Sequence, residues 1–128
     1  MPNNPLQSGL WTMVDNGVAK LLNLNFDNQW NIINSNIQDS NGQNPHPISG
    51  SFDPATGQIK FVENIAVGPW PVAPFAFPSY VGYYPSSPGA LEFAGTSSEV
   101  ILIHTGPFPG GSVQWVTVQH GWAAFIIQ

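Results

Sequence analysis

The sequence predicts an all-β fold, an eight-stranded antiparallel up-and-down meander barrel, on three observations. Thirteen Gly and thirteen Pro are spread along 128 residues, which leaves little room for helices. Short β-branched, aromatic and aliphatic stretches alternate with turn dipeptides at the spacing of a meander. Such a meander closes because closure removes exposed strand edges. Residues 1–128 are therefore expected to form a single barrel domain, with 1–7 as a flexible N-terminal segment.

The first two strands are predicted to form a hairpin. Residues 9–14 run into Asp15-Asn16-Gly17, and Asn-Gly is a strong hairpin signal because both positions tolerate positive φ. The return strand, 18–26, places Val18, Lys20, Leu22, Leu24 and Phe26 on one face. A third strand is expected over 30–38, with Trp30, Ile32 and Asn34 on one face and Ile33, Ser35 and Ile37 on the other.

The fourth and fifth strands are expected over 47–52 and 58–66, joined by the turn Asp53-Pro54-Ala55-Thr56-Gly57. Glu63 shares one face of the fifth strand with Ile59, Phe61 and Ile65. Residues 67–78 place four prolines around Trp70, and proline cannot donate to a sheet ladder. This segment is predicted to be a long ordered loop.

Three further strands are expected over 79–84, 91–103 and 113–127, with a break in the second near Ser97-Ser98. The last strand is apolar on both faces, with Trp115 on one and Val116 and Val118 on the other. A barrel strand of this kind needs cover outside as well as inside. The pattern predicts a homodimer or homotetramer.

The composition excludes several classes of partner. Charged residues make up 7% of the chain, while Asn and Gln supply twenty residues, which predicts a neutral, amide-rich surface. Lys20 and Lys60 are the only basic residues against seven acids, so neither nucleic acid nor a membrane is an expected partner. The first residues carry no signal-peptide pattern, which gives a cytoplasmic location by default, although a leader already removed would leave no trace. With no cysteine, disulfides and thiolate chemistry are excluded.

Ionisable side chains offer few catalytic patterns. The spacing of His46, His104 and His120 matches no zinc signature, which favours three unrelated histidines over a metal site. Four acids at turns are expected to cap their own backbone, namely Asp15, Asp27, Asp39 and Asp53. Glu63 and Glu92 instead lie within apolar strands, where each either anchors a ligand inside the barrel or faces a partner subunit. No cofactor, metal or catalytic residue is predicted, and the sequence favours a binding protein over an enzyme.

Several motifs are similar to those of a known family. Gly9-Leu10-Trp11, Ile48-Ser49-Gly50-Ser51-Phe52, and Trp115 followed by Gly121 resemble the avidin and streptavidin branch of the calycin barrels. The chain also resembles microbial avidin-like domains of about this length in His46 to Gly50, Ile59 to Phe61, Val81 to Tyr83, Ala94 to Thr96 and Gly121 to Ala123. The resemblance implies a barrel that binds a small molecule.

The same comparison predicts no tight binding of biotin. Avidins hold the polar head of biotin with an Asn, a Ser and an Asp or Asn, and the matching positions here are Met13, Gly17 and Ala123. Each buried polar group left without a partner costs about 1–3 kcal/mol. Trp115 matches the position whose indole, in avidins, covers the ligand from a neighbouring subunit.

The first functional hypothesis is a noncatalytic protein that binds a small, largely apolar ligand other than biotin in an aromatic-lined barrel. A carbohydrate-binding or self-assembling oligomeric structural module is one alternative, and an enzyme using a buried carboxylate is another. The candidate ligand-binding residues are Glu63 and seven aromatic residues: Trp11, Trp30, Phe61, Trp70, Tyr83, Trp115 and Trp122.

Overall fold

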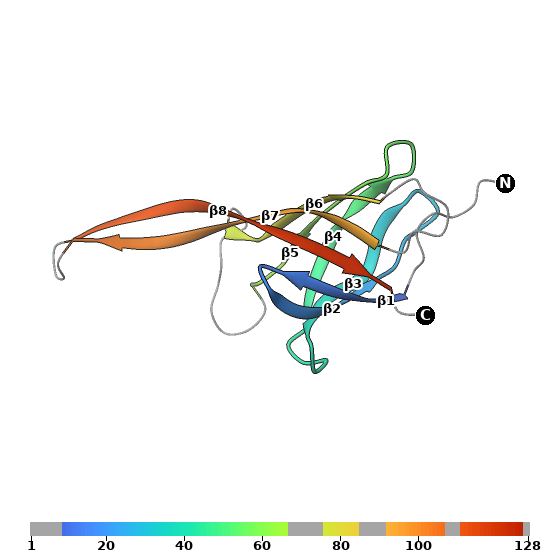
Figure 1. Ribbon diagram of the computed structural model, residues 1–128, viewed down its shortest axis with the longest axis horizontal. Helices are drawn as coiled ribbons and strands as arrows, with labels where there is room; N and C mark the ends of the chain where they lie inside the picture. Colours follow the sequence, from blue (N-terminus) through green and yellow to red (C-terminus); the bar gives the residue numbers. More distant parts are fainter. Residues whose placement is uncertain (1–8, 67–75, 85–91, 107–110, 127–128) are drawn as a thin grey trace.

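A computed structural model describes residues 9–66, 76–84, 92–106 and 111–126, except for the side chains of residues 104, 105, 112 and 113. These residues form eight antiparallel strands that close into a barrel in sequence order (Figure 1). The strands are β1 (Gly9–Asp15), β2 (Val18–Leu24), β3 (Asn31–Asp39), β4 (His46–Asp53), β5 (Gln58–Glu63), β6 (Ser79–Tyr83), β7 (Glu92–Thr105) and β8 (Ser112–Phe125). The predicted eight-stranded meander barrel is confirmed.

The turn chemistry explains the first hairpin. Asn16 and Gly17 both have positive φ, 52° and 79°, as a two-residue connection of this kind requires. The strands pair from Asp15 with Val18 down to Gly9 with Leu24. The barrel closes where β1 meets β8, because Thr12 pairs with Phe125 and Asp15 with Trp122.

The alternation predicted for the third strand is wrong over part of its length. The register of β3 against β4 shifts between Ile32 and Ser35, and Asn34 within this bulge has a φ of 48°. The extra residue turns both Ile32 and Ser35 inward, where each is buried. The buried Ser35 hydroxyl accepts a hydrogen bond from the Asn25 amide and donates one to the Ile33 carbonyl.

Strand bounds differ from the prediction at a few ends. β2 ends at Leu24 and β5 at Glu63, both earlier than expected, while β4 begins one residue earlier, at His46. The predicted break at Ser97-Ser98 is wrong, since β7 runs without interruption to Thr105. Ser97 and Ser98 stay in the ladder, paired with Tyr80 and Ser79, and the Ser97 hydroxyl donates a hydrogen bond to Asp15. Trp70, most of the predicted loop 67–78 and segment 1–7 lie outside the described residues.

Aromatic rings fill the interior. Trp11 and Phe93 stack with their centroids 4.7 Å apart, and Phe61 and Tyr80 stack at 4.8 Å. Trp122 meets Phe61, Tyr80 and Phe93 at steep interplanar angles. Such stacked and edge-on pairs add to the stabilisation that burial provides. No helix in the described part of the chain is long and apolar enough to cross a bilayer.

Strands β7 and β8 extend far beyond the barrel as a two-stranded arm (Figure 1). β6 pairs with β7 only from Ala94 to Ser98, while β7 and β8 pair with each other as far as Thr105 and Ser112. We define the arm as residues 99–105 and 112–120. Among the described residues, its two strands are paired only with each other.

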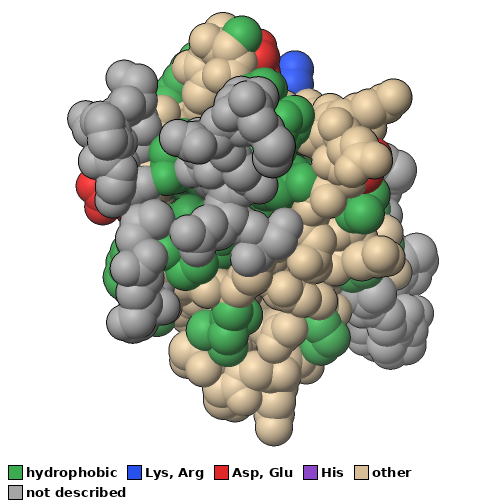
Figure 2. All heavy atoms as spheres, turned by 90° about the vertical axis from the view of Figure 1, so that its right-hand side faces the viewer, with side chains coloured by type: hydrophobic (Ala, Val, Ile, Leu, Met, Phe, Trp, Pro, Cys, Tyr) green, Lys and Arg blue, Asp and Glu red, His purple; other side chains and the backbone are tan. Residues whose placement is uncertain are grey.

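Among the described side chains visible at the barrel end opposite the arm (Figure 2), uncharged ones dominate. Figure 2 shows this end with only scattered red and blue side chains among tan and green ones. The view agrees with the small charged fraction of the chain, 7%.

Candidate functional site

A pocket of about 340 Å³, lined by both polar and apolar groups, opens beside the root of the arm. This volume lies at the lower end of the range for small-molecule sites. The lining comes from six strands (β1, β2, β5, β6, β7 and β8) and their flanking residues: Asp15, Asn16, Val18, Lys20, Glu63, Ile65, Pro78, Tyr80, Ser97, Ser98, Glu99 and His120. We call it the mouth pocket.

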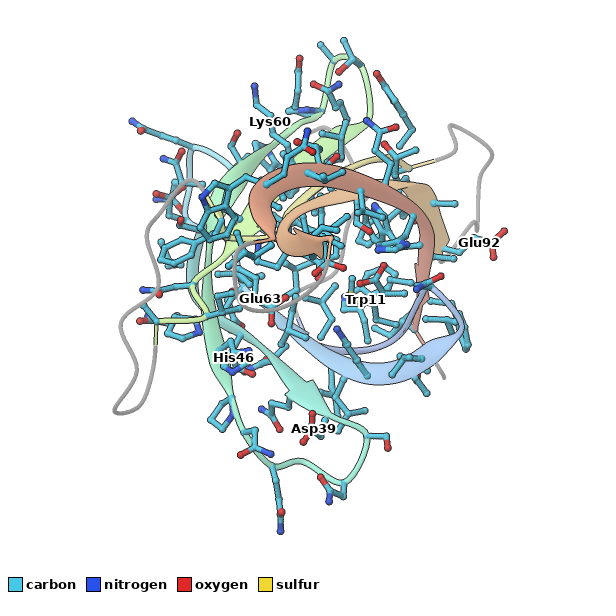
Figure 3. All side chains as sticks on the ribbon, turned by 90° about the vertical axis from the view of Figure 1, so that its left-hand side faces the viewer. Trp11, Asp39, His46, Lys60, Glu63 and Glu92 are labelled. Carbon is cyan, nitrogen blue, oxygen red and sulfur yellow. The ribbon has the colours of Figure 1, made fainter. Side chains whose placement is uncertain are left out.

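Glu63 is the buried acid of the mouth pocket. Strand β5 places Ile59, Phe61 and Glu63 on its inner face by simple alternation, and Glu63 is only 5% exposed. Its Oε1 accepts a hydrogen bond from the Tyr80 hydroxyl at 2.8 Å, and its Oε2 lies 2.7 Å from His46 Nδ1. Viewed along the arm, Figure 3 shows Glu63 within the ring of strands and His46 beside it. Two donors therefore satisfy and orient this carboxylate.

A second carboxylate, Asp15, approaches the same phenol from β1. Asp15 Oδ1 accepts a hydrogen bond from the Ser97 hydroxyl at 2.8 Å, and Oδ2 lies 3.8 Å from Lys20 Nζ. Oδ2 is also 3.3 Å from the Tyr80 hydroxyl. A phenol has one proton, so the shorter contact with Glu63 takes it. The result is a continuous polar chain: His46, Glu63, Tyr80, Asp15, Ser97.

The wall nearest the arm is formed by a third acid and a histidine. His120 Nε2 lies 3.0 Å from Glu99 Oε1, across neighbouring positions of β7 and β8. The described lining thus holds three carboxylates, Asp15, Glu63 and Glu99, against one ammonium, that of Lys20. The pocket carries a net negative charge while both histidines are neutral.

Tyr80 joins the pocket to the core. Its ring stacks on Phe61, while its hydroxyl reaches the two carboxylates. Burial raises the pKa of the Tyr80 phenol far above its ordinary value, and the nearby negative charges of Glu63 and Asp15 raise this pKa further. The phenol is accordingly a fixed neutral donor at the base of the pocket.

Of the eight sequence-predicted residues, Glu63 alone is among the described lining of the mouth pocket. Trp11, Phe61 and Trp122 belong to the buried core, and Trp30 packs half-buried against Phe26 and Phe52. Tyr83 and Trp115 are each 54% exposed, and Trp70 lies outside the described residues. The structure therefore does not gather the predicted aromatic residues around one described cavity.

The other polar residues of the mouth pocket were not among the candidate binding residues predicted from the sequence. The prediction that Asp15 caps its own backbone is wrong, because its side chain bonds to Ser97 across the barrel. The inward direction of the Asp15 side chain could have been predicted, because Asp15 continues the alternation of Trp11 and Met13. No comparable signal marked Ser97, Glu99 or His120, whose grouping depends on the register of β7 against β8.

The remaining ionisable residues are dispersed. Asp27 and Asp53 cap their own turns as predicted, accepting from the backbone amides of Gln29 and Ala55 respectively. Asp39 instead accepts from the side-chain amide of Asn44. Figure 3 places Glu92, Lys60 and Asp39 at the periphery, away from Glu63. His46 and His120 each pair with a different glutamate, and the described residues contain no group of three potential metal ligands.

No protein-family model matches the chain, and no curated protein matches it. What the mouth pocket can bind therefore follows from its own residues. Carboxylates accept hydrogen bonds, and the Tyr80 and Ser97 hydroxyls, whose protons are bonded to Glu63 and Asp15, can accept further ones. The arrangement suits a small molecule that brings several donors.

Proposed function

We propose that this chain is an avidin-like calycin barrel that binds, without catalysis, a small polar molecule in the mouth pocket. The buried, doubly bonded carboxylate of Glu63 carries the proposal. An acid of this kind is costly to bury unless it has partners, and ligand binding is a common reason to keep one in a concave site. The avidin-like motifs, Gly9-Leu10-Trp11 among them, support the same class of function.

The lining favours a ligand that carries amino or hydroxyl groups. While His46 and His120 are neutral, Asp15, Glu63 and Glu99 supply more negative charge than Lys20 neutralises. Val18, Ile65 and Pro78 add apolar surface beside them. A ligand with a donor-rich end and a short apolar part matches both features, whereas a wholly apolar ligand would leave the carboxylates facing hydrocarbon.

The test is a thermal-shift screen of small amines, amino alcohols and monosaccharides. Binding to the folded state alone raises stability by about 2.7 kcal/mol at a ligand concentration 100 times Kd. A true ligand raises the midpoint of wild type by several degrees, and Glu63→Gln loses the shift. Glu92→Gln removes the same charge from an exposed site and should keep it. A shift of equal size in all three proteins would refute binding at Glu63.

Two alternative functions, an enzyme and a carbohydrate-binding module, can be distinguished from this proposal. The enzyme hypothesis is favoured by the fixed orientation of Glu63, and it requires that Glu63→Gln keep binding but lose turnover of the bound compound. Carbohydrate binding is favoured by the sparse charge of the surface in Figure 2. A glycan array tests it directly, since a lectin would retain glycans that free monosaccharides displace.

A further inference from the structure

Four aliphatic side chains lie on the inner face of the arm, together with Glu99 opposite Val118 and Gln114 opposite Ile103. The inward alternation of Phe93 and Ser97 on β7 continues to Ile101 and Ile103, and that of Trp122 and His120 on β8 continues to Val118 and Val116. The two strands pair Ile101 with Val116 and Glu99 with Val118. We define Ile101, Ile103, Val116 and Val118 as the inner face.

This face extends past the barrel that would otherwise cover it. Figure 1 shows β7 and β8 running on well beyond the other strands. Ile101 is 37% exposed, and its three companions on the inner face are partly exposed. A two-stranded hairpin is at best marginally stable in water, and it gains stability when an apolar face is covered.

The scarcity of charged residues on the arm favours a second copy of the chain as the partner that covers the inner face. None of the described residues 100–103 and 114–119 is charged, although the chain carries a net charge of −5. Glu99 lies on the same face at the root of the arm, where it pairs with His120. Beyond Glu99, two copies can bring these strips together without bringing like charges into contact. A charged partner, by contrast, would find no opposite charge on that part of the strip. A bilayer would leave the backbone groups along the outer edges of the arm without hydrogen-bond partners.

The exposed area of the whole chain, the arm included, exceeds that of a compact monomer by an amount comparable with one side of a dimer interface. The single chain of 13.8 kDa exposes 7926 Å². A compact monomer of that mass exposes about 6,600 Å², so the excess is about 1,300 Å². One subunit of a stable homodimer contributes on the order of 800–2,000 Å² to its interface.

We propose that the inner face of the arm packs against the same face of a second copy, related by a twofold axis. In such an interface each residue of the patch meets the same patch of the partner, so the four aliphatic side chains cover one another. Glu99 and His120 lie at the root of the arm and also line the mouth pocket. The second copy would therefore sit beside the pocket entrance, whatever the pocket binds.

The first test is the mass of the full chain in solution by sedimentation equilibrium. We expect a dimer at about 10 µM, and we expect Val116→Lys to raise the dimer dissociation constant at least about 100-fold because it places a charge within the apolar contact. Thr117→Lys adds the same charge next along β8 but on the outer face, and it should leave the dimer intact. A monomeric wild type, or equal dissociation in both variants, overturns the proposal. So does a wild type that is monomeric and sediments with neutral phosphatidylcholine vesicles.

Disulfide cross-linking tests the same interface without a destabilising lysine. The chain has no cysteine, so any disulfide must form between the single cysteines that are introduced. Under mild oxidation, Val116→Cys or Ile101→Cys should form a covalent dimer at low protein concentration, because a twofold contact brings equivalent residues together. Thr117→Cys should stay monomeric on a denaturing gel. Covalent dimer from Thr117→Cys but from neither inner-face variant contradicts the assigned face.

Discussion

The Tyr80 hydroxyl donates a 2.8 Å hydrogen bond to the buried carboxylate of Glu63, and this bond connects the aromatic core to the mouth pocket. The ring of Tyr80 is held by stacking on Phe61, so the position of the hydroxyl is set by packing. The carboxylate is thus fixed by the interior of the barrel as well as by His46. Tyr80 therefore belongs to both the aromatic core and the mouth pocket.

The first prediction concerns alkaline pH. The pKa of Tyr80 is raised by burial and by the Glu63 and Asp15 carboxylates, so the folded protein keeps this proton at a pH where the unfolded chain has lost it. Stability is therefore fully present below about pH 10 and falls above it, by about 1.4 kcal/mol per pH unit for one proton. Tyr80→Phe should show a smaller decline. Urea unfolding of both proteins between about pH 8 and 11 measures it, and parallel declines would contradict the prediction.

A second prediction uses two glycines beside Trp122. A Cβ at Gly82 would lie 2.6 Å from the Trp122 ring, whereas a Cβ at Gly121 meets nothing within 4 Å. The ring cannot move freely, because its Nε1 donates to the carbonyls of Val81 and Thr96. Gly82→Ala should therefore cost about 1–3 kcal/mol and change the near-ultraviolet circular dichroism.

Gly121→Ala is the matched control for that experiment. It adds the same methyl group next to the same tryptophan, but into open space. Its free energy of unfolding should stay within about 0.5 kcal/mol of wild type. Equal losses in the two variants would show that contact with the indole is not the cause.

A third prediction concerns acid pH. The backbone and side-chain amides of Asn31 donate to the Asp27 carboxylate, as does the Gln29 backbone amide, and the bonds from Asn31 are the main cause of a lowered Asp27 pKa. A lowered pKa stabilises the fold above the ordinary value of about 3.9, and this stabilisation is lost as pH falls through the folded-state pKa. Asp27→Asn keeps one acceptor oxygen without the charge. The difference in free energy of unfolding between Asp27→Asn and wild type, measured by urea unfolding, should shrink below about pH 4. A difference that stays constant with pH would contradict a stabilising Asp27 charge.

The fourth prediction is that biotin does not bind tightly. Met13 occupies the position of a head-group asparagine in avidins, and here it is fully buried in the core. A buried thioether offers the polar head of biotin no comparable hydrogen bond. Titration calorimetry at micromolar protein should show no saturable heat, and a submicromolar Kd would overturn the interpretation of Met13 and Ala123.

The local signals in the sequence were sufficient for the fold but not for the pocket. Two local features were predicted correctly, because each depends only on residues that are neighbours in the sequence. They are the turn at Asn16-Gly17 and the alternation of Ile59, Phe61 and Glu63 along β5. The β3 bulge could not be predicted, because one residue at positive φ reverses the alternation that follows it. The contact of Asp15 with Ser97 joins residues 82 positions apart, and no pattern within either strand encodes it.

The closure of β1 on β8 also has a consequence for how the chain folds. Every other neighbouring pair in the barrel joins strands that are consecutive in sequence, whereas the pairing of Thr12 with Phe125 brings together segments from opposite ends of the described chain. Loop-closure entropy makes such a long-range step slow, while consecutive hairpins form quickly. The pairing of β1 with β8 should therefore set the folding rate. Until this pairing forms, β1 and β8 each present an open edge to other chains. Aggregation during refolding is therefore expected to depend on β1 and β8 more than on β2 to β6.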